Sequence, residues 1–217
     1  MIPVSLTTER ITLPDGSTAY PYRWNGETVA IRDNAANVLE IIALYNDQDM
    51  PEDEKGVQIV GMLFADPNDA FLSCDYDHGE FARLIEAVTW DICGLDLGGR
   101  TSDEPIWDAD EDAAAIRTSF RMAYGIEWDA IRDIIPFSEF VALNSGLPYE
   151  TPLGCAMHYR NRQNRPEPDK YNKKQLAEFD RLHEVFKLHK REGSHDRIEK
   201  TSNAMDDLAL ALVRKAG

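Results

Sequence analysis

The sequence predicts a mainly α protein with a short N-terminal β-hairpin, a helical bundle-like core and long C-terminal helices. Two short extended runs flank a turn-forming stretch near the start of the chain. Beyond residue 34, apolar residues recur at helical spacing in segment after segment. The chain has 217 residues, of which 43% are hydrophobic, so it can bury a sizeable core.

The β element is expected in "RITLPDGSTAYPYRW". Pro14, Asp15 and Gly16 supply turn chemistry between two extended runs, and residues 27–31 are expected to continue the sheet. The period changes to helical after "IRDN", where Asp33 or Asn34 is expected to cap a helix. The apolar positions of that helix are Val38, Leu39, Ile42 and Tyr45.

Two more helices are expected before residue 95. Pro51 and the three acids after it favour a helix N-terminus, and Asp66-Pro67 is expected to end that helix. Its apolar positions are Val57, Val60, Leu63 and Phe64. Asp77 is expected to cap a third helix that runs to Ile92 and ends at Gly94.

The second half of the chain is predicted to be helical throughout. A helix with Ile116, Phe120 and Tyr124 on one face ends at Gly125, and two short helices split by Pro136 follow. The remaining expected elements are a segment capped by Thr151-Pro152, a proline-broken linker at residues 165–169, an amphipathic helix over residues 176–189, and a last helix with Met205, Leu208 and Leu212. The amphipathic helix presents either a core face or a partner-facing surface.

The loop "GLDLGGRTSDEPIW" and the linker divide the chain into three predicted parts. These are an acidic part over residues 1–97, with a β-hairpin and three helices, a helical part over 98–162, and a helical extension over 163–217. Residues 1–162 can also be read as one domain.

The charge is strongly uneven. The net charge is −16, and residues 1–112 hold 24 acidic against 6 basic side chains, whereas residues 113–217 hold 15 against 17. The acidic half should repel nucleic acid and anionic membranes, and a basic protein partner is easier to accommodate. No apolar run approaches the roughly 20 residues of a membrane span, and the start "MIPVSLTTER" lacks signal-peptide character.

The acids of "WDADEDAAAIRTSFRM" resemble the opening of a calcium-binding loop. A calcium loop that began at Asp108 would need Gly at its sixth position and Glu at its twelfth, where this chain has Ala113 and Ser119. The acids are therefore expected to open a helix and to accept hydrogen bonds from its first N–H groups.

Other signals for chemistry are weak. Cys74, His78 and Cys93 lack the second close pair that a zinc site needs, and neither a metal nor another cofactor is expected. Cys155 and His158 could share a helix face as a nucleophile and base, and residues 157–200 are modestly basic. Phosphate-binding, dinucleotide-binding and hydrolase motifs are absent from the sequence, so we expect no enzyme and no nucleic-acid binding.

The most specific patterns are "DEPIWDADEDAAAIRTSFRMAYGIEWDAI" and "PFSEFVALNSGLPYETPLGCAMHYRNR". They resemble a family of small acidic proteins from the tail-gene cluster of siphophages that infect Gram-positive bacteria. The shared features are an acidic helix start at residues 110–112, Phe120, "YGI" and an acid at residues 124–127, "F-x-A-L" at residues 140–143, "GLP-x-x-T" at residues 146–151, and Arg160. The resemblance covers residues 18–162. It departs from the pattern at Phe137-Ser138 and in the tail after Arg165.

The resemblance implies a tail assembly chaperone, which binds the tape-measure protein in the host cytoplasm and recruits tail-tube subunits. Self-association is a further possibility. Aromatic residues at helix ends are the candidate partner-binding residues: Phe120, Tyr124, Trp128, Phe137 and Phe140. Core packing is the alternative for all five. Trp128 is expected to be the most exposed, because it lies between Glu127 and Asp129. The rival functions are a structural tail connector or completion protein kept in the virion, an enzyme that uses Cys155 and His158, and a nucleic-acid-binding regulator.

Overall fold

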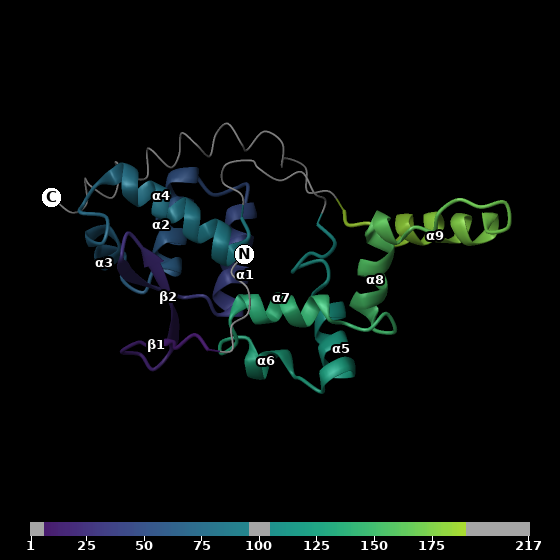
Figure 1. Cartoon of the computed structure of the whole chain (residues 1–217), viewed down its shortest axis with the longest axis horizontal. Coiled ribbons are helices and arrows are strands. Elements are labelled where there is room, and N and C mark those ends of the chain that lie inside the picture. Colours follow the sequence, from purple (N-terminus) through teal and green to yellow (C-terminus); the bar gives the residue numbers. More distant parts are fainter. Residues whose placement is uncertain (1–6, 96–104, 190–217) are drawn as a thin grey trace. The chain divides into compact units, whose positions relative to one another are not determined.

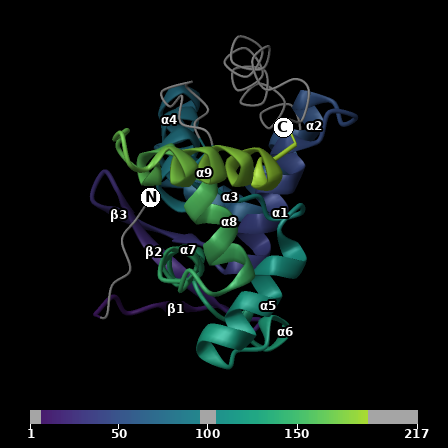
Figure 2. The same cartoon turned by 90° about the vertical axis from the view of Figure 1, so that its right-hand side faces the viewer.

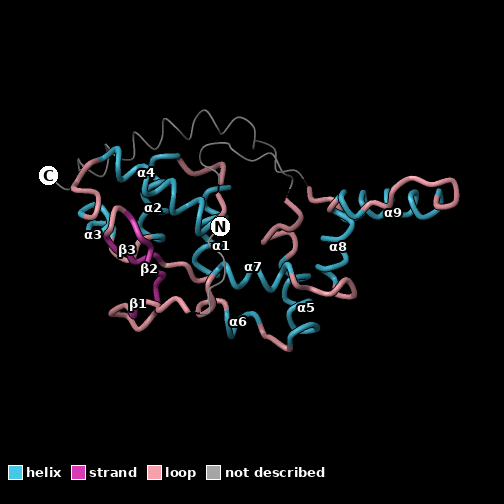
Figure 3. The backbone as a smooth tube through the Cα atoms, viewed as in Figure 1, coloured by secondary structure: helices cyan, strands magenta, loops and turns pink. Residues whose placement is uncertain are grey.

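The computed structural model describes residues 7–95 and 105–189. Within these residues the protein is mainly α, as predicted, and its strands precede its helices (Figures 1 and 3). The strands are β1 (Ile11–Thr12), β2 (Thr18–Trp24) and β3 (Glu27–Ile31). The helices are α1 (Ala35–Asn46), α2 (Glu52–Leu63), α3 (Pro67–Leu72), α4 (His78–Val88), α5 (Ala113–Tyr124), α6 (Trp128–Ile131), α7 (Phe137–Ser145), α8 (Pro152–Arg160) and α9 (Lys173–Phe186).

The described residues form two compact units. Unit 1 contains residues 7–95 with Arg132–Phe140, and unit 2 contains residues 105–131 and 141–189. The three-part division made from the sequence stays a prediction. The helix expected around Met205, Leu208 and Leu212 lies outside the described residues.

The N-terminal hairpin is part of a three-stranded antiparallel sheet in the order β1-β2-β3. The predicted turn after Leu13 joins β1 to β2 and has Gly16 at φ 84°. Asn25 and Gly26 join β2 to β3 with φ values of 48° and 90°, as a tight two-residue hairpin turn requires. The continuation of the sheet by residues 27–31 is confirmed.

Among the described residues up to 95, four helices, α1 to α4, follow the sheet, one more than predicted. The extra helix is α3, which Asp66 caps by accepting hydrogen bonds from the N–H groups of Asn68 and Asp69. Asp66-Pro67 therefore both ends one helix and starts the next. Asp77 caps α4, and the chain then makes a π-helical turn over Thr89–Cys93 before Gly94 stops it in the left-handed region, at φ 69°.

The N–H groups at the N-terminus of α1 find acceptors in the cap residue and in a distant segment. Asn34 is the cap residue and accepts a hydrogen bond from the N–H of Asn37, while the Asp33 carboxylate pairs with Arg10. The first two N–H groups of α1 donate to the carbonyls of Ile135 and Arg132, both at 2.9 Å. The segment Arg132–Phe140 belongs to unit 1 because it supplies these acceptors.

Unit 2 is built on α5 and α8, which pack against each other, with α6 against α5 and α9 against α8. Gly125, at φ 67°, ends α5 as predicted, and Thr151 caps α8 by accepting a hydrogen bond from the N–H of Gly154. In Figures 1 and 2, α9 lies across one end of α8. The predicted amphipathic helix ends at Phe186, so His189 lies beyond it.

Candidate interaction surface

The acids precede α5, as predicted, but Asp112, the residue at its N-terminal cap, makes no side-chain hydrogen bond to the first N–H groups of the helix. The acids instead bind N–H groups of the turn before it. Asp108 accepts hydrogen bonds from the N–H groups of Asp110 and Glu111, each at 2.9 Å. Asp112 accepts one from the N–H of Asp108 at 2.9 Å. Among the described residues, no cluster of three or more His, Cys, Asp or Glu side chains has the arrangement of a metal site.

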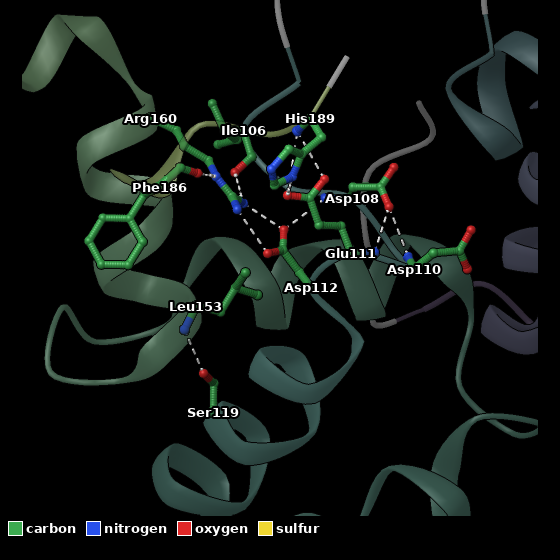
Figure 4. A network of polar contacts seen from close by, with 10 residues as sticks. All are labelled: Ile106, Asp108, Asp110, Glu111, Asp112, Ser119, Leu153, Arg160, Phe186 and His189. Carbon is green, nitrogen blue, oxygen red and sulfur yellow. Dashed lines mark hydrogen bonds and ion pairs between the residues drawn. The ribbon is translucent and has the colours of Figure 1, made fainter. Parts of the chain in front are cut away.

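The carboxylate of Asp112 has a second partner that the sequence did not indicate. It receives two hydrogen bonds from the guanidinium of Arg160, at 2.5 and 2.9 Å, and the two side chains are only 7% and 8% exposed. Arg160 also donates to the carbonyl oxygens of Ile106, at 3.2 Å, and Phe186, at 2.6 Å. One buried cation therefore joins the loop before α5 to the ends of α8 and α9 (Figure 4).

The contact between α5 and α8 is close and specific. The buried hydroxyl of Ser119 in α5 accepts a hydrogen bond from the N–H of Leu153 at 2.9 Å (Figure 4). Gly154 follows in α8, where a Cβ atom would lie 2.1 Å from the carbonyl oxygen of Pro148. Only glycine fits this position, which lets the turn before α8 fold back against the helix.

An aromatic surface lies where α8 meets α9. We define the α8 aromatic face as Tyr149, His158 and Tyr159. The rings of Tyr149 and Tyr159 lie 5.0 Å, edge to face, from that of His158, and their hydroxyls are 2.9 Å apart. This hydrogen bond holds the pKa of Tyr149 above its ordinary value. Tyr149 is 48% exposed, so the face reaches the surface of unit 2.

The five residues predicted to bind a partner do not form one surface. Phe120, Tyr124 and Trp128 lie in unit 2, whereas Phe137 and Phe140 stack on each other in unit 1, with ring centroids 5.8 Å apart. Phe120, Phe137 and Phe140 are buried. Tyr124 is 36% exposed and donates its hydroxyl to the carbonyl oxygen of Leu143 at 2.8 Å.

The expected exposure of Trp128 is wrong. Its side chain is buried, with its ring edge to face with that of Phe120 at 6.2 Å. The flanking acids were the reason to expect exposure, but both pair with arginines of α5 while the tryptophan ring between them turns inward. Asp129 accepts two hydrogen bonds from Arg117 and Glu127 accepts two from Arg121.

The cysteines of unit 1 lie in apolar surroundings. Burial raises the pKa of the Cys93 thiol from 9.0 to about 12. Burial also raises the pKa of Cys74, and the nearby carboxylates of Glu80 and Asp77 add to this effect. Protonated thiols are poor nucleophiles and poor metal ligands. In unit 2, His158 belongs to the aromatic face, and its ring also lies 6.1 Å from that of Phe179.

Comparison with known protein families identifies the chain's family. Residues 19–188 match the family described as "Bacteriophage Gp15 protein". The chain belongs to the bacteriophage Gp15 protein family. No curated protein and no solved structure matches the chain. Membership in the Gp15 family indicates a structural or assembly protein of a bacteriophage.

The Gp15 match extends beyond the resemblance seen in the sequence. That resemblance ended at residue 162, with the tail after Arg165 as a departure, but the family match includes all of α9. The helices of unit 2 and the α8 aromatic face therefore lie within the matched residues. No helix among the described residues is long and apolar enough to cross a membrane.

Proposed function

We propose that this protein is a tail assembly chaperone. It binds the tape-measure protein in the host cytoplasm, keeps it from aggregating, and assists the addition of tail-tube subunits without catalysing a reaction. The observation that carries the proposal is the family match over residues 19–188, which indicates phage structure or assembly. The assignment to siphophages of Gram-positive hosts comes from the sequence resemblance around residues 107–160.

Charge and fold agree with this role. A tape-measure protein is a long helical client with apolar stripes, and grooves between helices accept such stripes. Unit 2 contains the packed helices that a groove of this kind requires. The net charge of −16 would keep a complex with an apolar client dispersed.

Among the five aromatic residues chosen from the sequence, Tyr124 is the one a client can reach in the folded state. It lies at the exposed end of α5. Contact of the client with the four buried rings stays a prediction and requires local opening. We therefore assign Tyr124 to the proposed client surface and treat the other four rings as support for the fold.

The test is co-expression of the chain with the tape-measure protein of the same phage. The expected result is a soluble complex of fixed stoichiometry that survives size-exclusion chromatography. The tape-measure protein expressed alone is the control and should be insoluble. If the tape-measure protein stays insoluble and nothing co-purifies, the chaperone role is wrong, and a connector or completion protein becomes the reading to pursue.

A further inference from the structure

Helix α9 is held in unit 2 mainly by α8. Of its 14 residues, only Phe179 and His183 are buried. No side-chain hydrogen bond from Asn172 caps its N-terminus, and residues 161–172, with two prolines, connect it to α8. A helix this short is marginal in water without tertiary packing, so its contact with α8 determines whether it stays folded and seated.

The residues of α9 that touch the α8 aromatic face have the spacing of a bound helical ligand. Phe179, His183 and Phe186 stand at positions i, i+4 and i+7, which places them on one side of the helix. The ring of Phe179 lies 5.4 Å from that of Tyr159, and the ring of Phe186 stacks on Tyr159 at 5.9 Å with an interplanar angle of 7°. His183 Nδ1 lies 2.8 Å from the carbonyl oxygen of Tyr159.

The opposite side of α9 is polar and exposed. It carries Lys173, Lys174, Glu178, Arg181 and Glu184, with Val185 as an exposed apolar residue among them. Helix α9 is therefore amphipathic and bound by one apolar side, as a separate helical peptide in a groove would be.

The α8 aromatic face is built largely without α9. The hydroxyl contact between Tyr149 and Tyr159 and the packing of both rings on His158 lie within residues 149–159. Arg160, at the end of α8, keeps its two bonds to Asp112 and its bond to Ile106 if its bond to Phe186 is lost. Removal of α9 would therefore expose a preformed aromatic face.

The polar bonds to α9 lie where they can open independently of that face. Arg165, in the linker, pairs with Asp180 at 2.8 and 2.9 Å, and both side chains are part-exposed. His189, beyond α9, pairs with Glu111, and its side chain is 94% exposed. Exposed pairs of this kind contribute little stability and are readily exchanged for water.

We propose that the α8 aromatic face receives an apolar helical segment of the client, and that α9 occupies this face until the client displaces it. The proposal rests on the proposed function, which supplies a helical client. Helix α9 thus takes the place of the client and covers an apolar surface while no client is present. The client displaces α9 only if it binds the α8 aromatic face more tightly than α9 does.

Two substitutions that weaken the contact of α9 with α8 distinguish this proposal from a purely structural role of α9. Phe179→Ala loosens α9 but leaves the α8 aromatic face intact, so it should increase client binding. Tyr159→Ala loosens α9 and also removes the centre of the face, so it should decrease client binding. Lys174→Ala, on the exposed side of α9, is the matched control.

The variants are best compared by competition. Full-length wild type and one variant are co-expressed with the tagged tape-measure protein, and mass spectrometry gives the ratio of the two chains in the complex. We expect Phe179→Ala to exceed wild type by about tenfold and Tyr159→Ala to fall to about a tenth, with Lys174→Ala equal to wild type. If Phe179→Ala and Tyr159→Ala change the ratio in the same direction, the proposal is wrong.

Hydrogen exchange on the wild-type protein gives a second test that needs no variant. The amides of α9 should exchange faster in the client complex than in the free protein, whereas those of α8 should exchange more slowly. If a complex forms and α9 keeps or gains protection, the client binds elsewhere, and this proposal fails while the chaperone role stands. If wild type and all variants fail to bind the tape-measure protein, the chaperone role itself fails, and this proposal with it.

Discussion

Replacement of Asp112 by alanine should destabilise unit 2 strongly. The substitution leaves the Arg160 guanidinium, whose side chain is 8% exposed, without its carboxylate partner. Removal of one member of a buried ion pair costs about 3–5 kcal/mol, because the remaining charge stays desolvated. The hydrogen bond from the N–H of Asp108 is lost as well, at about 1 kcal/mol. The expected decrease in the free energy of unfolding is therefore at the upper end of this range, about 4–5 kcal/mol.

A matched control is available on the same helix. Arg117 and Asp129 also form a two-bond arginine–aspartate pair, but their side chains are 47% and 69% exposed. Arg117→Ala should cost less than about 1 kcal/mol, because water replaces the lost partner. The comparison holds the chemistry of the pair constant and changes its burial.

The assay is urea denaturation monitored by hydrogen exchange, which reports on α5 and α8 separately from unit 1. The double variant Asp112→Ala with Arg160→Met should recover part of the loss, because no charge is then left buried without a partner. If Asp112→Ala costs no more than Arg117→Ala, the Arg160 network does not hold unit 2 together and the reasoning is refuted.

Three further predictions follow from burial and local geometry. Trp128→Ala should lower the free energy of unfolding by about 3 kcal/mol in urea denaturation, because the ring packs on Phe120. A decrease below about 1 kcal/mol would show that the ring is exposed. Gly154→Ala should destabilise the protein by at least about 3 kcal/mol, because the added Cβ would collide with the backbone. Gly61→Ala, in α2 with no atom within 4 Å of its Cβ position, should stabilise it by about 0.5–1 kcal/mol. Melting curves of the two variants, measured together, check both. Because the pKa of Cys93 is raised on folding, the unfolded thiol ionises first, so stability should fall between pH 9 and about 12; a flat profile for this contribution, measured against Cys93→Ala, would contradict the burial of the thiol.

The elements that sequence reasoning placed well depend on local signals. Asp77 and Thr151 were recognised as caps, and Asn34 as one of two candidates with Asp33, because a cap acts on N–H groups two or three residues away. Gly94 and Gly125 were recognised as helix ends because each adopts the left-handed conformation that stops a helix. Such signals are contained in four or five consecutive residues.

The features that were missed depend on partners distant in sequence. Asp112 and Arg160 are 48 positions apart, and nothing near either residue indicates that they meet. Trp128 was expected at the surface because its neighbours are charged, but those charges pair with arginines on α5. In both cases a charged side chain is held by a partner that only the fold reveals.

The candidate site shows the same limit. The amphipathic pattern of residues 176–189 indicated a helix with one apolar side, and left open whether that side met the core or a partner. The structure places Phe179 and His183 against α8, as an occupant of an aromatic face. The residues of that face, Tyr149, His158 and Tyr159, come from a turn and a helix whose pairing with α9 no local pattern specifies.

Whether the protein leaves the tail once it is built tests the assembly role most directly. Quantitative mass spectrometry of infected cells and of purified virions would compare the amounts of this chain and the tape-measure protein in each. The account predicts that the chain is abundant in cells, associated with unassembled tape-measure protein, and absent from virions. A fixed copy number of the chain in purified virions would contradict the chaperone role and identify a structural component of the tail.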